Sequence, residues 1–355
     1  MDTAFWANRR VLVTGHTGFF GGWLSLSLLR LGARVGGIAL PPEAAPNLHD
    51  CLRLDRQMTS HLVDLRDRAS LAAAVADCRP EVVFHLAAQA LVRRAHADPL
   101  ATIETNVMGT ANLLDALRTV DDLRAVVLVT TDKVYDNREW AWGYRETDPL
   151  GGKEPYGASK ACCELVADAY RDAYFAGSGV GLATVRAGNL IGGGDWSADR
   201  LIPDAVRAFA AGDPLTLRNP AATRPWQHVL GPVDGLLRLA KHLVAAPEEV
   251  SEAWNLGPAA ADSRPVAWVI DRLAALWQAD DADRPVWRAD NQTHPYEAQH
   301  LSLDSAKARA RLDWRPAWAL EDALARTVEW YRAQIAGSDM WAVSCGQVEA
   351  FADAR

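Results

Sequence analysis

The 355-residue chain lacks the features that mark several protein classes. No apolar run approaches the roughly 18 residues of a membrane span, and the first ten residues lack a signal peptide's apolar core. There is no C-x-x-C spacing, and the cysteines are odd in number: Cys51, Cys78, Cys162, Cys163 and Cys345. Neither a disulfide framework nor a metal site is therefore indicated, and we expect reduced, structural thiols in a cytoplasmic protein that does not bind membranes.

Positive charge is also scarce. The 37 Lys and Arg residues are outnumbered by 45 Asp and Glu residues, which leaves a formal net charge of -8. Nucleic acids and anionic membranes need a dominant positive field, so neither is an expected partner. The length suggests roughly two domains, or one dinucleotide-binding domain with an appended lobe.

A glycine-rich turn follows the first apolar segment. Residues 10–14 read as a buried strand, Gly15, Gly18 and Gly21 follow, and a helical pattern then runs to about Leu31. Glycines at such a turn let the backbone approach a pyrophosphate, which lies at the helix N-terminus where amide N–H groups favour anions. The order of strand, glycines and helix predicts a dinucleotide site.

The second strand, 34–39, departs from the usual dinucleotide pattern. An acid for the adenosine ribose normally ends this strand, but here Leu-Pro-Pro follows, so the acid is missing or displaced to Glu43. No Arg or Lys replaces it, which favours NAD over NADP. After a third strand near 61–63, Asp64 is a candidate acceptor for the adenine amino group, whereas Asp67 fits the cap of the next helix.

Strand and helix patterns alternate five times in the first half of the chain. A fourth strand spans 81–88, a long helix carrying Asn106 spans 98–120, and a fifth strand begins at Val126. His85, inside the fourth strand, is interpreted as a hydrogen-bonded core residue. The alternation predicts an α/β fold with a doubly wound, Rossmann-like parallel sheet, whose ligands bind along the carboxyl ends of the strands.

Reactive side chains cluster where the fifth strand ends. Thr131, Asp132 and Lys133 follow it directly, and Tyr156 and Lys160 lie four residues apart at the start of a helical pattern. An ammonium beside a phenol favours the phenolate and lowers its pKa, so the pair can exchange a proton with a substrate hydroxyl. An ordinary surface Tyr and Lys remain the alternative interpretation.

The second half of the chain alternates less regularly. We assign 1–189 and about 228–262 to the dinucleotide domain, 190–227 and 263–335 to a smaller mixed substrate lobe, and 336–355 to a tail with no assigned structure. Residues 252–257 read as a strand returning to the main sheet, and 320–335 as an amphipathic helix. Arginines of the lobe suit a diphosphate, although surface salt bridges would explain them equally well: Arg200, Arg218 and Arg224.

These motifs together resemble the extended short-chain dehydrogenase/reductase superfamily and, within it, the CDP-glucose 4,6-dehydratases. The resemblance rests on the glycine turn, Tyr156-x-x-x-Lys160, and six more specific segments: His85–Gln89, Asp132–Asn137, Arg138–Glu146, Arg186–Trp196, Arg224–His228 and His294–Ala298. It implies an NAD-dependent hydro-lyase that converts CDP-glucose to CDP-4-dehydro-6-deoxyglucose, working as a homodimer or homotetramer.

The resemblance also implies roles for individual residues. Tyr156 and Lys160 serve oxidation at C4, Thr131 holds the 4-oxygen, Lys133 takes the C5 proton and Asp132 protonates the leaving 6-hydroxyl. It places NAD against Gly15, Gly18, Phe19, Phe20, Gly21, Asp64, Leu65, Leu86, Ala87, Ala88, Asn106, Tyr156 and Lys160. It places the CDP-sugar against Asn189, Arg200, Arg218, Arg224, His228 and Glu297.

Two other functions remain open on the sequence. One is a 4-epimerase or a dehydratase for another nucleotide, and the Asp132 and Lys133 pair argues against the epimerase. The other is a non-catalytic dinucleotide sensor, which would need neither this pair nor Tyr156 and Lys160. The tryptophans Trp140, Trp142, Trp196 and Trp226 suit either stacking on a ligand or packing within loops.

Overall fold

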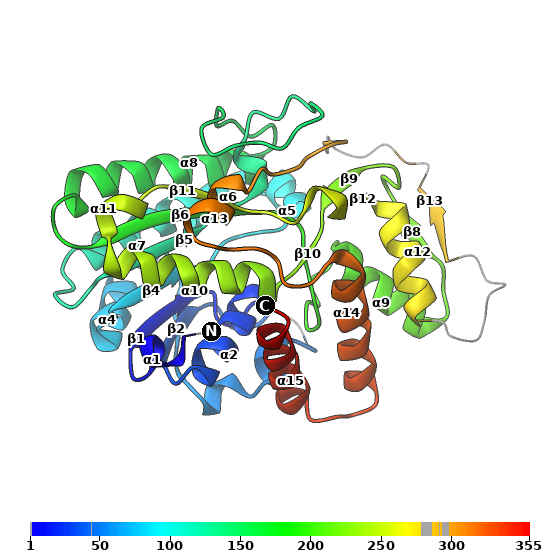
Figure 1. The fold of residues 1–355 in the computed structure, drawn as a ribbon, viewed down its shortest axis with the longest axis horizontal. Helices are drawn as coiled ribbons and strands as arrows, with labels where there is room; N and C mark the ends of the chain where they lie inside the picture. The colour runs from blue at the N-terminus through cyan, green and yellow to red at the C-terminus, as the bar shows by residue number, and fades with distance from the viewer. Residues whose placement is uncertain (1, 44, 278–285, 291, 293–297) are drawn as a thin grey trace.

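The computed structural model describes residues 2–43, 45–277, 286–290, 292 and 298–355. Its centre is a seven-stranded sheet in the order β11-β6-β5-β4-β1-β2-β3, and every neighbouring pair is parallel (Figure 1). The strands are β1 (Arg10–Thr14), β2 (Arg34–Ala39), β3 (Thr59–Leu62), β4 (Val82–His85), β5 (Ala125–Val129), β6 (Gly181–Ala187) and β11 (Ala253–Leu256). The predicted doubly wound sheet is confirmed, including the return of β11 to its edge.

Helices cover both faces of this sheet because alternate strand residues point to opposite sides. Val11 and Val13 of β1 belong to the core beneath α2 (Phe19–Arg30) and α10 (Leu230–Ala245). Leu12 belongs to a second core beneath α4 (Arg68–Cys78), α7 (Gly109–Leu117) and α8 (Pro155–Tyr170). Strands buried on both faces explain the continuous apolar runs of the sequence.

The expected helix over 98–120 is interrupted by a wider turn. It consists of α6 (Pro99–Ile103), a π-helical turn η2 (Glu104–Met108) and α7, which ends at Leu117. Asn106 sits in this π-turn and is 1% exposed. Turns of this kind are frequent at functional sites, and this one points an amide into the protein interior.

Short strand pairs and helices build the second lobe, beyond the carboxyl ends of the main strands. β8 (Leu215–Leu217) pairs with β13 (Trp287–Ala289), β9 (Thr223–Pro225) with β12 (Ser263–Pro265), and β7 (Leu190–Ile191) with β10 (Gln227–His228). The helices here are α9 (Leu201–Ala211), α12 (Val266–Trp277) and α14 (Leu320–Ile335). The helix expected over 320–335 is confirmed.

The C-terminal segment, to which the sequence assigned no structure, forms α15 (Met340–Asp353). Met340, Val348 and Phe351 are buried against α14 and α2, and Trp330 donates a hydrogen bond to Ser344. The apolar residues of this segment do not gather on one clear face, so periodicity was a poor guide. Tertiary packing supplies the burial that stabilises this helix.

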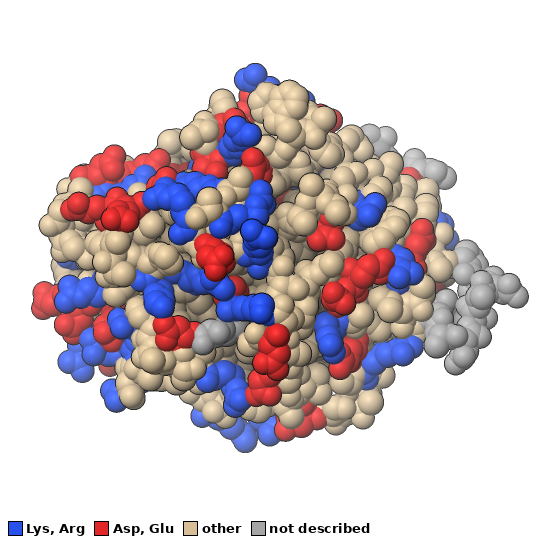
Figure 2. Space-filling view, viewed as in Figure 1, with Lys and Arg blue, Asp and Glu red and all other residues tan. Residues whose placement is uncertain are grey.

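Short helical elements complete the described part of the chain: α1 (Thr3–Trp6), α3 (Leu48–Cys51), η1 (Leu54–Arg56), α5 (Val92–Ala97), η3 (Asp132–Val134), η4 (Arg171–Phe175), α11 (Pro247–Val250), η5 (Ala260–Asp262) and α13 (Ala306–Arg311). None of the described helices combines the length and apolar character that crossing a bilayer requires. On the face in Figure 2, basic side chains lie among acidic ones, in agreement with ion pairs such as Arg272 with Glu321 and Arg326 with Glu329.

Candidate active site

The glycine turn is folded so tightly that side chains would not fit. A Cβ on Gly21 would lie 2.1 Å from the Gly15 carbonyl oxygen, and one on Gly15, where φ is +77°, would lie 2.8 Å from the Ala87 nitrogen. Gly18 caps α2 without a side-chain hydrogen bond. The backbone of the turn and the first residues of α2 therefore face a cavity, which is the cradle that a dinucleotide pyrophosphate needs.

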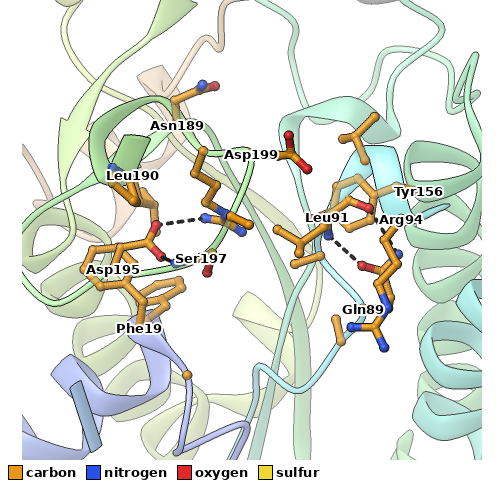
Figure 3. Close-up of a pocket in the computed structure, with 18 of the residues that line it drawn as sticks. Phe19, Gln89, Leu91, Arg94, Tyr156, Asn189, Leu190, Asp195, Ser197 and Asp199 are labelled. Carbon is orange, nitrogen blue, oxygen red and sulfur yellow. Dashed lines mark hydrogen bonds and ion pairs between the residues drawn. The ribbon is translucent and has the colours of Figure 1, made fainter. Parts of the chain in front are cut away.

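The cavity has a volume of about 1120 Å³ and runs from this turn, past the ends of β4, β5 and β6, into the second lobe. Single-ligand pockets rarely exceed about 1,000 Å³, so a coenzyme and a second large ligand fit together. Figure 3 shows Tyr156, Gln89 and Arg94 on one side of the cavity, Asn189 and Asp195 on the other, and Phe19 below.

Most of the predicted site residues line this one cavity. They are Gly15, Gly18, Phe19, Phe20, Gly21, Asp64, Leu65, Leu86, Ala87, Ala88, Thr131, Asp132, Lys133, Tyr156, Lys160, Asn189, Arg200, Arg218 and Arg224. The cavity brings together residues as distant in sequence as Gly15 and Arg224, because the carboxyl ends of parallel strands share one edge of the sheet.

Asp132 is a buried carboxyl in the 3-10 turn η3, directly after β5. It is 3% exposed, its Oδ1 accepts a hydrogen bond from Thr131 (3.1 Å), and its Oδ2 has no hydrogen-bond partner in the described part of the chain. Burial raises its pKa above the usual range, while Lys133 and the Thr131 hydrogen bond oppose this rise. The geometry thus favours a protonated carboxyl, which is what a general acid requires.

Tyr156 and Lys160 lie on the first turns of α8, both buried. Burial raises the pKa of Tyr156 to about 12, and a hydrogen bond with Thr131 opposes the rise. The lowered phenol pKa expected from the neighbouring ammonium is therefore wrong for the protein alone. The Lys160 Nζ donates to the Val129 carbonyl (3.0 Å), and burial lowers the pKa of this amine.

The loop after β2 brings Glu43, the candidate for the displaced ribose acid, to the cavity, but the carboxylate is already paired. Glu43 lines the cavity, but its carboxylate pairs with Arg94 of α5 at 2.5 Å. Asp64 likewise lines the cavity and is held by Arg66 (2.7 Å), which lowers the pKa of this carboxyl. Asp67 accepts from the Ser70 amide and caps α4, as expected.

The lobe brings its arginines to the far side of the same cavity. Arg200 pairs with Asp195 at 3.6 Å, and Arg218 donates to the Asp199 carbonyl at 3.3 Å. Arg224 is only 3% exposed and lies close enough to Asp132 to lower the pKa of that carboxyl. Three guanidinium groups around one cavity suit the oxygens of a diphosphate.

Two of the predicted contact residues do not reach the cavity. Asn106 is buried and binds Gln89 through both its amide oxygen and nitrogen, while also donating to Ser159 (2.9 Å). His228 is packed between the rings of Trp23 and Trp318, and burial lowers its pKa to about 3. Their side chains point into the core, so neither is placed to touch a ligand. Glu297 lies outside the described residues.

His85 is a core residue, as interpreted. Its ring nitrogens bond to Thr14 (2.7 Å) and Thr110 (3.0 Å), and burial lowers its pKa to about 3. Trp196 and Trp226 line the cavity, whereas Trp140 and Trp142 do not, and Trp142 is 62% exposed. The structure adds Gln89, Arg93 and Arg94 to the lining. Gln89 closely follows β4, and Arg93 and Arg94 lie on α5, the next helix; the order of strand and helix was the signal in the sequence, since ligands bind at that edge.

Comparisons with known proteins agree with this geometry. Residues 12–327 match the family model described as GDP-mannose 4,6 dehydratase. The chain is 48% identical over 345 residues to a CDP-glucose 4,6-dehydratase of Salmonella typhimurium, covering 96% of this chain and 95% of that protein. The resemblance inferred from the motifs is thereby confirmed.

Solved structures give the same architecture. A double mutant of the dTDP-glucose 4,6-dehydratase of Streptomyces venezuelae, with NAD bound, superposes with a TM-score of 0.76 at 28% identity, covering 93% of this chain and 99% of that one. The UDP-glucose 4-epimerase of Thermotoga maritima has a TM-score of 0.78 at 22% identity, with 92% and 99% covered, and shows the fold alone. With a family model that spans most of its length, the chain belongs to the GDP-mannose 4,6 dehydratase family.

Proposed function

We propose that this protein is an NAD-dependent hydro-lyase that converts CDP-glucose to CDP-4-dehydro-6-deoxyglucose. The observation that carries the proposal is the 48% identity, over nearly the whole of both chains, to a CDP-glucose 4,6-dehydratase. The site supports it, because an acid and an amine stand beside a Tyr and Lys pair at one strand end.

NAD fits the half of the cavity next to the glycine turn. The turn, the N-terminus of α2 and the small residues Ala87 and Ala88 would hold the pyrophosphate and let the coenzyme lie against the backbone. When bound, NAD supplies a hydride acceptor and a positive charge on its nicotinamide ring. That charge would favour the Tyr156 phenolate, which burial alone disfavours.

In this proposal Tyr156, as the phenolate, would remove the proton of the 4-hydroxyl, and NAD would be the acceptor of the C4 hydride. The positive charge of Lys160 would favour that phenolate. Thr131 hydrogen-bonds with Tyr156 and would hold the 4-oxygen in this proposal. The ketone at C4 makes the C5 proton acidic, and Lys133 takes it. Asp132 would give its proton to the 6-hydroxyl, which departs as water. Return of the hydride to C6 would leave an enolate, and Lys133 would give its proton back to C5. The proton that Tyr156 took from the 4-hydroxyl balances the one that Asp132 gave, so the net change is the loss of one water.

The lobe formed by 190–227 and 263–335 binds the rest of the substrate in this proposal. Asn189, Arg200, Arg218 and Arg224 face the cavity beyond the reacting residues, where the diphosphate must lie if the hexose sits at Tyr156. The base then extends toward β8 and β13. This arrangement keeps the long substrate anchored at a distance from the chemistry.

One incubation series tests the function. Purified protein with NAD is given CDP-, dTDP-, UDP- and GDP-glucose, and the products are read by mass. Loss of one water from the CDP-sugar alone supports the proposal. An unchanged mass with a new C4 stereoisomer would indicate an epimerase, water loss from another nucleotide would change the substrate, and no turnover of any sugar would indicate a sensor.

We also propose that the protein is cytoplasmic and forms at least a homodimer. Exposed apolar side chains lie on α6, η2 and α8, which are packed together: Leu100, Ile103, Met108 and Leu165. Exposed apolar residues grouped on neighbouring helices are typical of a subunit interface. Sedimentation of the wild type and of Leu165→Glu measures this: the wild type should sediment as a dimer or tetramer and the variant as a smaller species.

A further inference from the structure

A buried ion pair lies beneath the active site and touches no part of the cavity. Glu164 is 1% exposed and Arg186 is 4% exposed, and both are absent from the cavity lining. The guanidinium grips the carboxylate with two hydrogen bonds, from Nε to Oε1 (3.1 Å) and from Nη2 to Oε2 (3.0 Å). Burying two charges is costly, and replacing such a pair with apolar residues is often neutral or stabilising, so stability alone explains it poorly.

Glu164 connects the two elements that carry the reacting residues. It lies one turn after Lys160 and two turns after Tyr156 on α8, so all three share one face of this helix. Its Oε1 accepts a hydrogen bond from the Thr130 hydroxyl at 2.5 Å, and Thr130 directly precedes Thr131. The carboxylate therefore ties the catalytic helix to the beginning of the turn after β5.

Arg186 holds the other end of the same turn. Its Nη1 donates to the Tyr135 hydroxyl (3.0 Å) and to the Glu146 carbonyl (3.1 Å). Tyr135 follows the 3-10 turn that carries Asp132 and Lys133, and its hydroxyl in turn donates to Asn255 (2.7 Å). One ion pair thus reaches the residue before and the residue after the segment 131–134.

We propose that the Glu164 and Arg186 pair positions the dehydration machinery, by clamping both ends of the 130–135 turn against α8. The clamp sets the distance between Tyr156, which serves oxidation at C4, and the Asp132 and Lys133 pair, which serves elimination across C5 and C6. Both groups must reach neighbouring carbons of one sugar ring, so a displacement of about 1 Å carries a large kinetic penalty. The negative charge of Glu164 also acts on Lys160, since it raises the pKa of the amine against the effect of burial.

Thr130→Val removes the hydrogen bond to Glu164, and Tyr135→Phe removes the hydrogen bond from Arg186. Thr184→Val is the matched control. Thr184 donates to the same carboxylate at 2.6 Å but lies inside β6, away from the turn. We expect kcat for water loss to fall about tenfold in the first two variants, with KM changing less than about twofold, because binding groups are untouched. All three variants should lower the urea midpoint by similar amounts, because each removes one buried hydrogen bond to the ion pair. Thr184→Val should lower kcat by no more than about twofold. Thr130→Ser, which keeps the hydroxyl, should have the kcat of the wild type.

A second readout does not depend on activity. Hydrogen exchange of the backbone over 130–137 should accelerate in Thr130→Val and Tyr135→Phe and stay unchanged in Thr184→Val. Equal losses of kcat and stability in all three variants, with unchanged exchange over this turn, would overturn the proposal and leave the ion pair a packing feature. The kcat measurement rests on the proposed function. The hydrogen-exchange measurement does not, and it still tests whether the ion pair holds the 130–135 turn if the wild type dehydrates no sugar nucleotide.

Discussion

Asp132→Asn is the substitution that examines the proposed chemistry most directly. The carboxyl is buried, its Oδ1 accepts from Thr131, and burial raises its pKa. Asparagine has nearly the same shape and keeps an oxygen for Thr131, but it has no proton to give. The substitution therefore removes general acid catalysis while leaving the packing of the turn in place.

We expect Asp132→Asn to slow the elimination of water and to leave the rate of oxidation at C4 unchanged. A positioned general acid contributes about 10²–10⁴-fold, which corresponds to about 2.7–5.5 kcal/mol of barrier at roughly 1.36 kcal/mol per tenfold. Water loss should slow by this factor. Oxidation at C4, which the proposed mechanism assigns to Tyr156, should still proceed, so the absorbance of reduced coenzyme should appear and persist.

Stability should change in the opposite direction. A carboxyl whose pKa is raised on folding contributes stability that is complete below its unfolded pKa of about 3.9 and is lost as pH rises through the folded value. At neutral pH the wild type has lost this stability, because its unfolded state gains from ionisation of the carboxyl. Asp132→Asn has no such ionisation and loses nothing. Urea unfolding at pH 7 should show the variant to be at least as stable as the wild type.

The assay combines stopped-flow absorbance with the mass of the product, and Asp199→Asn is the control. Asp199 also lines the cavity, but its carboxylate is partly exposed and pairs with Arg93 at 2.6 Å. Its loss should slow elimination less than about threefold, as for an exposed ion pair. Dehydration by Asp132→Asn at the wild-type rate would refute the role of this carboxyl.

Three further outcomes are expected. Lys133→Met should slow water loss by about 10²–10⁴-fold while oxidation at C4 persists, and full-speed dehydration would exclude Lys133 as the base. Gly21→Ala places a Cβ within 2.1 Å of the Gly15 carbonyl oxygen and so distorts the turn. The binding free energy of NAD, measured by calorimetry, should weaken by about 1–3 kcal/mol. Gly346→Ala is the control, because a Cβ there meets open space and NAD binding should not change. Burial lowers the pKa of His16 to about 4 and those of His85 and His228 to about 3. The stability that these neutral histidines contribute is therefore complete above their unfolded pKa of about 6.5 and is lost as pH falls from there through the folded values. The urea midpoint should fall between pH 7 and pH 5, and an unchanged midpoint would contradict this.

The local patterns of the chain predicted the dinucleotide half of the molecule well. Apolar strands, glycines and helix starts are local signals, and buried parallel strands such as β1 and β5 are apolar along their whole length. The carboxyl ends of those strands must meet at one edge, so the neighbourhood of Thr131, Asp132, Lys133 and Tyr156 followed from the order of the elements. Helix α15 was missed because its stability comes from α2 and α14.

Residue type and spacing along the chain were sufficient to predict the parallel sheet, the glycine cradle and the set of reactive residues at the edge of the sheet. The direction in which a side chain points, and the groups that surround it, became known from the folded chain. His228 and Asn106 turned out to face the core, Glu43 to be paired with Arg94, and the Tyr156 phenol to have a raised pKa. Burial and ion pairing depend on groups that are distant in sequence, and no local pattern contains them.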